Sequence, residues 1–155
     1  MKLSSSEEYG LRCLLQLARR AGQGPVGVRT VAEAEGLSED WVAKLLGTLR
    51  RGGLVQSTRG AHGGYQLTRA PHEITVWDAM KILGGRIFDD AFCASHTGTA
   101  ETCSHTGDCS LQPLWSWLDH ALEQSLSKVT LSDCLAGPTL TTGLSIGTGV
   151  ALEAP

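Results

Sequence analysis

The sequence of 155 residues lacks an apolar run of the length that a membrane-spanning helix needs, about 18 residues or more. Its first residues lack the apolar segment of a secretory signal peptide, so we expect a cytoplasmic protein without a membrane partner. The sequence also contains no phosphate-binding glycine loop and no Ser/His/Asp arrangement typical of nucleophilic enzymes. We therefore do not expect an enzyme.

Basic residues are scarce in the second half of the chain. Residues 71–155 contain three Lys or Arg against ten Asp or Glu, whereas residues 1–70 contain ten against six. The formal charge of −3 thus combines +4 over the first region with −7 over the second. Because charge acts locally, the net acidity does not exclude a nucleic-acid partner for the first region. A surplus of four positive charges also occurs on protein surfaces that do not bind nucleic acid.

Apolar residues recur at helical spacing in the first region. The pattern predicts three helices, over about 4–20, 30–35 and 38–51. Two short β-capable runs, 54–58 and 65–68, then flank a Gly-rich segment and predict a hairpin. Three helices followed by a hairpin are the order of a winged helix-turn-helix domain. A generic small α+β domain is the alternative.

The second region contains a helix over about 74–83 and a longer helix from about Pro113 to Lys128. The longer helix has a wide apolar face, which predicts pairing with its copy in a homodimer; packing against its own domain is the alternative. We therefore predict a mainly α fold with a small β-wing. It has four parts: a winged helix-turn-helix DNA-binding domain over 1–85, a cysteine-containing loop over 86–112, a dimerisation helix over 113–135 and a C-terminal tail over 136–155.

Three of the five cysteines, Cys93, Cys103 and Cys109, lie close together in the predicted loop. An odd number of cysteines without a signal peptide is unlike a secreted disulfide framework. Thiolates clustered on a loop in a reducing compartment are typical metal ligands, and their softness favours zinc or an iron–sulfur cluster. The spacing is not the CxxC of zinc ribbons, but His96 or His105 would complete a Cys3His zinc site. Coincidental free cysteines are the remaining alternative.

Several segments of the chain resemble the Rrf-type bacterial transcription regulators, which include IscR-like and NsrR-like iron–sulfur proteins. The segments are 1–4, 41–46, 49–55, 59–65 and 129–133, and the resemblance covers about residues 1–135. Its most specific part is the Arg-Gly-x-x-Gly-Gly motif at 59–64 combined with the cysteine triplet. The resemblance implies a homodimeric winged-helix repressor that binds a palindromic double-stranded DNA operator. It also implies an iron–sulfur cluster, 4Fe–4S or 2Fe–2S, in each subunit.

The resemblance carries the role of cluster ligand over to Cys93, Cys103 and Cys109. IscR-like proteins add a histidine three residues after the last cysteine, where this chain has Gln112. NsrR-like proteins add an acidic residue from the partner subunit, and Glu8 occupies the matching position. The resemblance therefore favours Glu8 of the partner subunit as the fourth ligand. The alternative for Glu8 is a solvated residue at the start of a helix.

The third predicted helix and the hairpin are the expected DNA-contacting parts. We expect the helix to enter the major groove and Arg59 to reach a minor groove. The predicted contact residues are Trp41, Lys44, Thr48, Arg59, Gly60, His62, Gly63 and Gly64. The predicted function is a cluster-dependent repressor that senses redox state, nitric oxide or iron–sulfur status. A zinc-stabilised DNA-binding module without sensing and an iron–sulfur electron-transfer protein are the alternatives.

Overall fold

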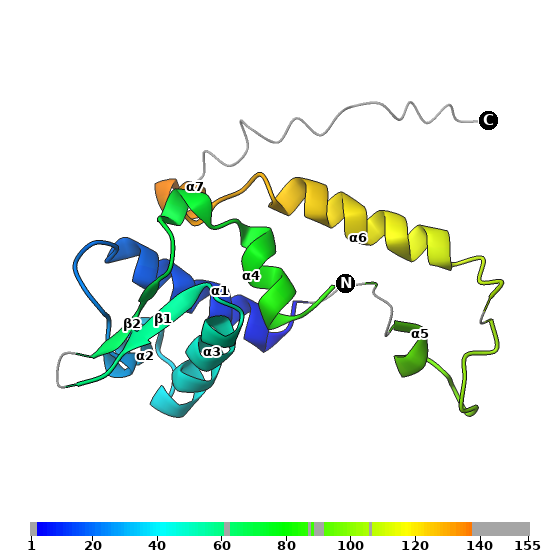
Figure 1. The fold of residues 1–155 in the computed structure, drawn as a ribbon, viewed down its shortest axis with the longest axis horizontal. Helices are drawn as coiled ribbons and strands as arrows, with labels where there is room; N and C mark the ends of the chain where they lie inside the picture. The colour runs from blue at the N-terminus through cyan, green and yellow to red at the C-terminus, as the bar shows by residue number, and fades with distance from the viewer. Residues whose placement is uncertain (1–2, 61–62, 87, 89–91, 106, 138–155) are drawn as a thin grey trace.

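A computed structural model describes residues 3–60, 63–86, 88, 92–105 and 107–137. Its fold is mainly helical with a two-stranded antiparallel wing, which confirms the predicted fold class. The elements are α1 (Ser5–Arg19), α2 (Val28–Glu35), α3 (Glu39–Arg51), β1 (Val55–Thr58), β2 (Gly64–Leu67), the 3-10 turn η1 (Pro71–Glu73), α4 (Val76–Leu83), α5 (Phe92–Ser95), α6 (Gln112–Leu126) and α7 (Leu131–Ala136). Figure 1 shows that the wing and the segment around α5 lie at opposite ends of the molecule.

Local sequence signals explain where the first three helices begin and end. Ser4 and Glu7 form a capping box at α1: the Glu7 N–H donates to Ser4 Oγ at 3.2 Å, and the Ser4 N–H donates to Glu7 Oε2 at 2.7 Å. At the end of α2, Gly36 has a φ of 65°, a left-handed conformation that favours glycine. Ser38 then caps α3 by accepting a hydrogen bond from the Trp41 N–H at 3.3 Å. These signals define the helix-turn-helix.

The wing is joined to the rest of the fold by backbone hydrogen bonds. β1 and β2 pair from Val55 opposite Leu67 to Thr58 opposite Gly64. Val26 and Tyr65 exchange two backbone hydrogen bonds of 2.8 Å, which anchor β2 to the segment between α1 and α2. The position of the wing relative to the helices is therefore determined by the backbone as well as by side-chain packing.

One apolar core unites the winged-helix part. It is formed mainly by α1, α2, α3 and β1, with contributions from residues before and within α4 and from α7. Burial of these side chains is the main favourable term in folding. Its members are Cys13, Leu14, Leu17, Ala18, Val26, Val31, Ala32, Val42, Leu45, Leu46, Leu49, Leu54, Val55, Ile74, Ala79 and Leu131.

The segment predicted as one dimerisation helix over 113–135 consists of two helices. α6 ends at Leu126, and a new capping box at Thr130 starts α7, with the Asp133 N–H donating to Thr130 Oγ1 at 3.2 Å. Leu131 is fully buried in the core, so α7 packs with the winged-helix part. Two further predictions differ slightly from the structure. The helix predicted over about 74–83 is α4, which begins at Val76 after its cap Thr75, and the loop predicted over 86–112 contains the short helix α5. Of the predicted tail over 136–155, Ala136 is the last residue of α7, and residues 138–155 lie outside the described residues.

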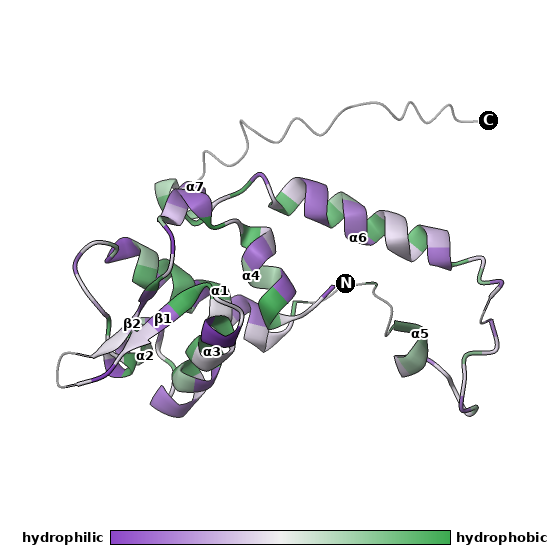
Figure 2. Ribbon diagram, viewed as in Figure 1, coloured by the Kyte–Doolittle hydropathy of each residue, from purple (hydrophilic) through white to green (hydrophobic). Residues whose placement is uncertain are grey.

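α6 stands apart from the core and packs chiefly against α4. Its apolar and polar residues alternate along its length, as Figure 2 shows. Leu114 and Trp117 in α6, and Leu111 just before it, are 49%, 67% and 55% exposed. No helix in the part of the chain that the structure describes has both the length and the apolar character needed to cross a membrane.

The close packing of α1 on α4 generates a prediction about stability. A Cβ at Gly10 would collide with the side chain of Leu83. We therefore expect Gly10→Val to lower the free energy of unfolding by about 1–3 kcal/mol, measured by urea denaturation. Gly47→Ala is the control, because a Cβ at this helical position in α3 meets only ordinary contacts and should raise stability by about 0.5–1 kcal/mol. Equal stability of Gly10→Val and the wild type would contradict this packing.

Candidate nucleic-acid interface and cysteine segment

α3 buries one face in the core and leaves its other face to solvent. Val42, Leu45, Leu46 and Leu49 form the buried face, whereas Ala43 and Lys44 are exposed. Trp41 is half-buried at the edge of the core, and the Lys44 Nζ lies 5.2 Å from the centroid of its ring. A cation at this distance from an aromatic face is attracted by it. Trp41 therefore orients the ammonium group of Lys44 on the exposed face.

The Thr48 side chain makes two hydrogen bonds within α3. Its hydroxyl donates a hydrogen bond to the carbonyl oxygen of Lys44 at 3.1 Å and accepts one from Arg51 Nη2 at 3.0 Å. In this arrangement the Thr48 side chain positions the exposed guanidinium of Arg51. Arg51 is thus one of the two basic groups, with Arg50, that the C-terminal part of α3 presents to solvent.

The glycines of the wing have two separate structural roles. Gly60 has a φ of 115°, which side-chain-bearing residues rarely adopt, and it follows the exposed Arg59. A Cβ at Gly63 would collide with the Thr58 carbonyl, and one at Gly64 would collide with the Val26 carbonyl. Gly63 and Gly64 are therefore required by the packing of the wing on its own chain. The predicted contact His62 lies outside the described residues.

The basic side chains of the winged-helix part fall into two groups. Arg12 pairs with Glu35 at 2.6 Å, Arg29 with Glu33 at 2.8 Å, and Arg69 with Asp78 at 3.6 Å. Among the residues that the structure describes, the others on α3 and the wing form no ion pair: Lys44, Arg50, Arg51 and Arg59. These four side chains are exposed, so their charge is available to a polyanion.

The three clustered cysteines lie on a segment remote from α3. Cys93 is in α5, Cys103 and Cys109 lie between α5 and α6, and all three are partly buried. Thiols of this kind suit a soft metal or an iron–sulfur cluster chemically. Within the described ranges, however, no three His, Cys, Asp or Glu side chains are close enough to hold a metal ion. The donor chemistry fits such a group, whereas the described residues of one chain do not bring three donors together.

The structure distinguishes Glu8 from its neighbour Glu7. The Glu7 carboxylate caps α1, and its side chain covers Gly84 so closely that a Cβ there would collide with it. Glu8 lies one residue further on and is exposed, and its carboxylate forms no hydrogen bond or ion pair with any residue that the structure describes. Of these two carboxylates, the Glu8 group is the one available to a ligand.

His96 is held in the orientation that metal-binding histidines often have. Its Nδ1 lies 2.8 Å from the Phe92 carbonyl oxygen and 3.0 Å from Ser95 Oγ, and its ring stacks on the Phe92 ring with centroids 4.2 Å apart. A carbonyl oxygen only accepts, so this bond requires a proton on Nδ1 and leaves Nε2 as the acceptor of the neutral ring. The other two candidates, His105 and Gln112, are exposed.

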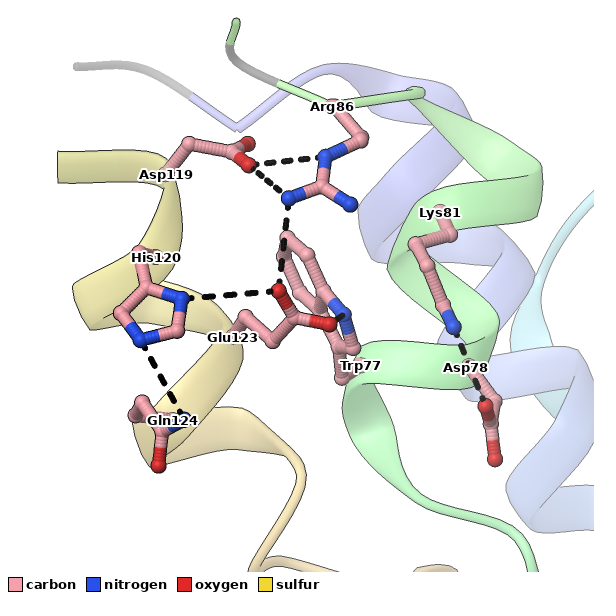
Figure 3. A network of polar contacts seen from close by, with 8 residues as sticks. All are labelled: Trp77, Asp78, Lys81, Arg86, Asp119, His120, Glu123 and Gln124. Carbon is pink, nitrogen blue, oxygen red and sulfur yellow. Dashed lines mark hydrogen bonds and ion pairs between the residues drawn. The ribbon is translucent and has the colours of Figure 1, made fainter. Parts of the chain in front are cut away.

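One polar cluster has no counterpart in the sequence predictions. Arg86, Asp119, Glu123 and Trp77 connect α6 to the end of α4 (Figure 3). These residues are too far apart in the sequence to form a local motif. The one sequence feature that pointed to the cluster was an acidic residue, Asp119, on the otherwise apolar side of the predicted helix.

Known proteins resemble this chain over most of its length. Residues 3–137 match the model of the Rrf2 family, described as an iron-dependent transcriptional regulator. The transcriptional regulator CymR of Bacillus subtilis is 32% identical over 133 residues, which cover 86% of this chain and 88% of that protein. The solved structure of CymR, described as the global cysteine regulator of B. subtilis, has a TM-score of 0.65 at 30% identity and covers 88% of this chain and 97% of that one. The solved structure of T. potens IscR has a TM-score of 0.65 at 34% identity, over 88% and 87% of the two chains.

The burial of the cysteines generates a prediction about thiol reactivity. Cys13 is fully buried in the core, and burial raises the pKa of its thiol to about 12, so it stays protonated at pH 8. In the metal-free native protein we expect iodoacetamide to modify Cys93 and Cys109, and to modify Cys13 only after unfolding in urea. Peptide mass spectrometry before and after urea treatment measures this. Modification of native Cys13 at the rate of Cys93 would contradict its burial.

Proposed function

The chain belongs to the Rrf2 family of transcriptional regulators, and on this basis we propose that it is a homodimeric, iron–sulfur-dependent repressor that binds a palindromic operator. The observation that carries the proposal is the separation of two sites in one chain. Exposed basic residues that form no ion pair with the described part of the chain lie on α3 and the wing, and three cysteines lie on the segment at the opposite end (Figure 1). Membership of this family also confirms that the chain is not an enzyme.

The division of labour along the chain is part of the proposal. Residues 1–85 form the DNA-binding head, residues 86–112 carry the cluster ligands, and the helix within 113–135 joins two subunits. The exposed Leu111, Leu114 and Trp117 support this use of α6, because large apolar side chains on one exposed helix are typical of an interface. The predicted tail, 136–155, has no role in this proposal. We place the protein in the cytoplasm.

We propose that DNA is read by α3 and the wing. α3 enters the major groove with Lys44, oriented by Trp41, while Thr48 acts through Arg51. Arg59 enters an adjacent minor groove, where narrow A·T-rich stretches attract guanidinium groups. Gly60, Gly63 and Gly64 give the wing the shape that this approach needs, and His62 adjoins them.

The proposed cluster ligands are Cys93, Cys103 and Cys109, with Glu8 of the partner subunit as the fourth. A site shared between two chains is consistent with the described residues of one chain, which do not bring three donors together. The bound group supplies sensitivity to redox state, nitric oxide or iron–sulfur supply. Its loss would release a tie between α1 of one subunit and the cysteine segment of the other. The two heads would then change their relative position, to which half-sites about 34–36 Å apart are sensitive.

A zinc-stabilised module without sensing is the second candidate. It is favoured by one observation, the orientation of His96 with its Nε2 left as an acceptor. With Cys93 three residues earlier, His96 would complete a Cys3His set in place of Glu8.

Metal analysis of two variants tests the cluster ligands. Anaerobically purified wild-type protein should be brown and contain iron and acid-labile sulfide, and Glu8→Gln should lose most of both, because an amide is a poor ligand. Glu7→Gln is the matched control, since glutamine retains the capping box at this position. Stoichiometric zinc without sulfide would overturn the cluster, and full iron content in Glu8→Gln would overturn Glu8 alone.

Salt-dependent DNA binding tests the wing. Arg59→Ala should weaken binding to a palindromic duplex selected from random-sequence DNA, and it should reduce the slope of log K against log salt concentration by about 1. Lys128→Ala, an exposed charge beyond α6, serves as the control and should leave both quantities unchanged. An unchanged slope for Arg59→Ala would remove this residue from the interface.

A further inference from the structure

We propose that Arg86 and Asp119 form a latch that fixes the angle between α6 and the DNA-binding head, and thereby the half-site spacing that the dimer accepts. The inference rests on the proposed function, because it requires two heads joined through α6. It assigns a positioning role to residues that touch neither DNA nor a cluster ligand.

The latch is a dense group of polar contacts between α6 and the end of α4. Arg86 donates to Asp119 Oδ2 from Nε at 2.8 Å and from Nη2 at 2.5 Å, and Nη2 lies 3.3 Å from Glu123 Oε2. The Trp77 indole N–H donates to the other oxygen of Glu123 at 3.1 Å. Figure 3 shows the guanidinium of Arg86 between the two carboxylates of α6, beside the Trp77 ring. Two helices are thus joined by directed hydrogen bonds.

Asp119 is unusual for its place in the fold. Its side chain is only 3% exposed, although α6 contributes no residue to the apolar core. A buried carboxylate is costly unless charged hydrogen bonds compensate for its lost hydration. Arg86 supplies two such bonds to one oxygen atom. Because these bonds are directional, they constrain orientation more than apolar packing of the same area would.

A second attachment lies beyond the C-terminal end of α6. The Val76 N–H donates to the Val129 carbonyl at 2.8 Å, and the Leu131 N–H donates to the Ile74 carbonyl at 2.9 Å. These backbone bonds join the chain after α6 to the residues that precede α4. They hold one end of α6, and they do not depend on any side chain of the latch.

A helix such as α6 keeps a fixed direction relative to the head when it is attached at two points along its length. The backbone bonds act as a pivot, and the latch at Asp119 lies roughly 10 Å up the helix from Leu126, at 1.5 Å per residue. The exposed Leu114 and Trp117 lie further from the pivot than Asp119 does. If these residues contact the second copy, a small rotation of α6 about the pivot moves the partner's head by a larger distance. The latch therefore controls the relative position of the two heads.

The head side of the latch is itself rigid. Trp77 is 4% exposed, and α4, which carries it, packs on both α1 and α3. Arg86 follows Gly85, whose φ of 79° marks the turn where the chain leaves α4 toward the cysteine segment. The latch thus lies between the DNA-reading helix and the dimer-forming helix.

Operator spacing provides the test. The probe is a palindromic duplex selected by the wild-type dimer from random-sequence DNA, compared with the same duplex carrying one base pair inserted at its centre. The insertion rotates the half-sites by about 35°, and we expect the wild type to lose about tenfold or more in affinity. In the double variant Arg86→Met with Asp119→Leu, the buried pair is replaced by apolar side chains, which can preserve stability. We expect its affinities for the two duplexes to agree within about threefold.

Two further variants keep the test decisive. Arg86→Lys retains a charge opposite Asp119 and so protects folding, but it lacks the planar fork and should lose part of the discrimination. Lys81→Met is the control, because Lys81 pairs only with Asp78 on the surface of α4 and should leave discrimination intact. Circular dichroism and light scattering establish that each variant is folded and dimeric.

The outcomes separate the latch from the proposed function. A wild-type protein that selects no operator or does not dimerise overturns both. Folded, dimeric Arg86 variants that bind the selected duplex and still reject the insertion as strongly as the wild type overturn the latch alone.

Discussion

The burial of one face of α1 is the interaction on which the rest of the structure depends. α1 packs against α2, α3, α4, α7 and β2, and Cys13, Leu14 and Leu17 on this face are almost fully buried. Gly10 allows Leu83 to approach closely enough to seat α4. Because α1 contacts both the DNA-reading part and the helices that lead to the cysteine segment, its position relates the two proposed sites to each other.

The basic residues of the two regions of the chain are used differently in the fold. The basic residues of α3 and the wing keep their charge at the surface, whereas Arg86 in the acidic region directs its charge into two carboxylates of α6. A single net charge of −3 conceals this difference. Electrostatic attraction to DNA depends on the charge of one surface, α3 and the wing. The attachment of α6 depends on the local pairing of Arg86 with Asp119.

Much of the fold follows from local patterns, and the departures have local causes too. Helical spacing predicted α1, α2 and α3, and two β-capable runs flanking a Gly-rich segment predicted the wing. The break between α6 and α7 was not predicted, because Leu126 and Val129 continue the apolar spacing and outweighed the capping pattern of Thr130 and Asp133. The cysteines were recognised by type and spacing. The different uses of Glu7 and Glu8 were not, since adjacent carboxylates look alike until one of them caps a helix.

The sequence by itself determined the winged-helix order, the uneven charge, the cysteine triplet and the family resemblance, because each is carried by neighbouring residues or by characteristic spacing. Only the tertiary structure decided that a side chain at Gly64 would collide with the Val26 backbone and that Arg86 meets Asp119 across 33 residues. The physical reason is that each residue of a long-range contact has many possible partners along the chain, so the local sequence does not indicate which one it meets. Packing of the fold brings Arg86 and Asp119 together, and their charged hydrogen bonds then offset part of the cost of burying the Asp119 carboxylate.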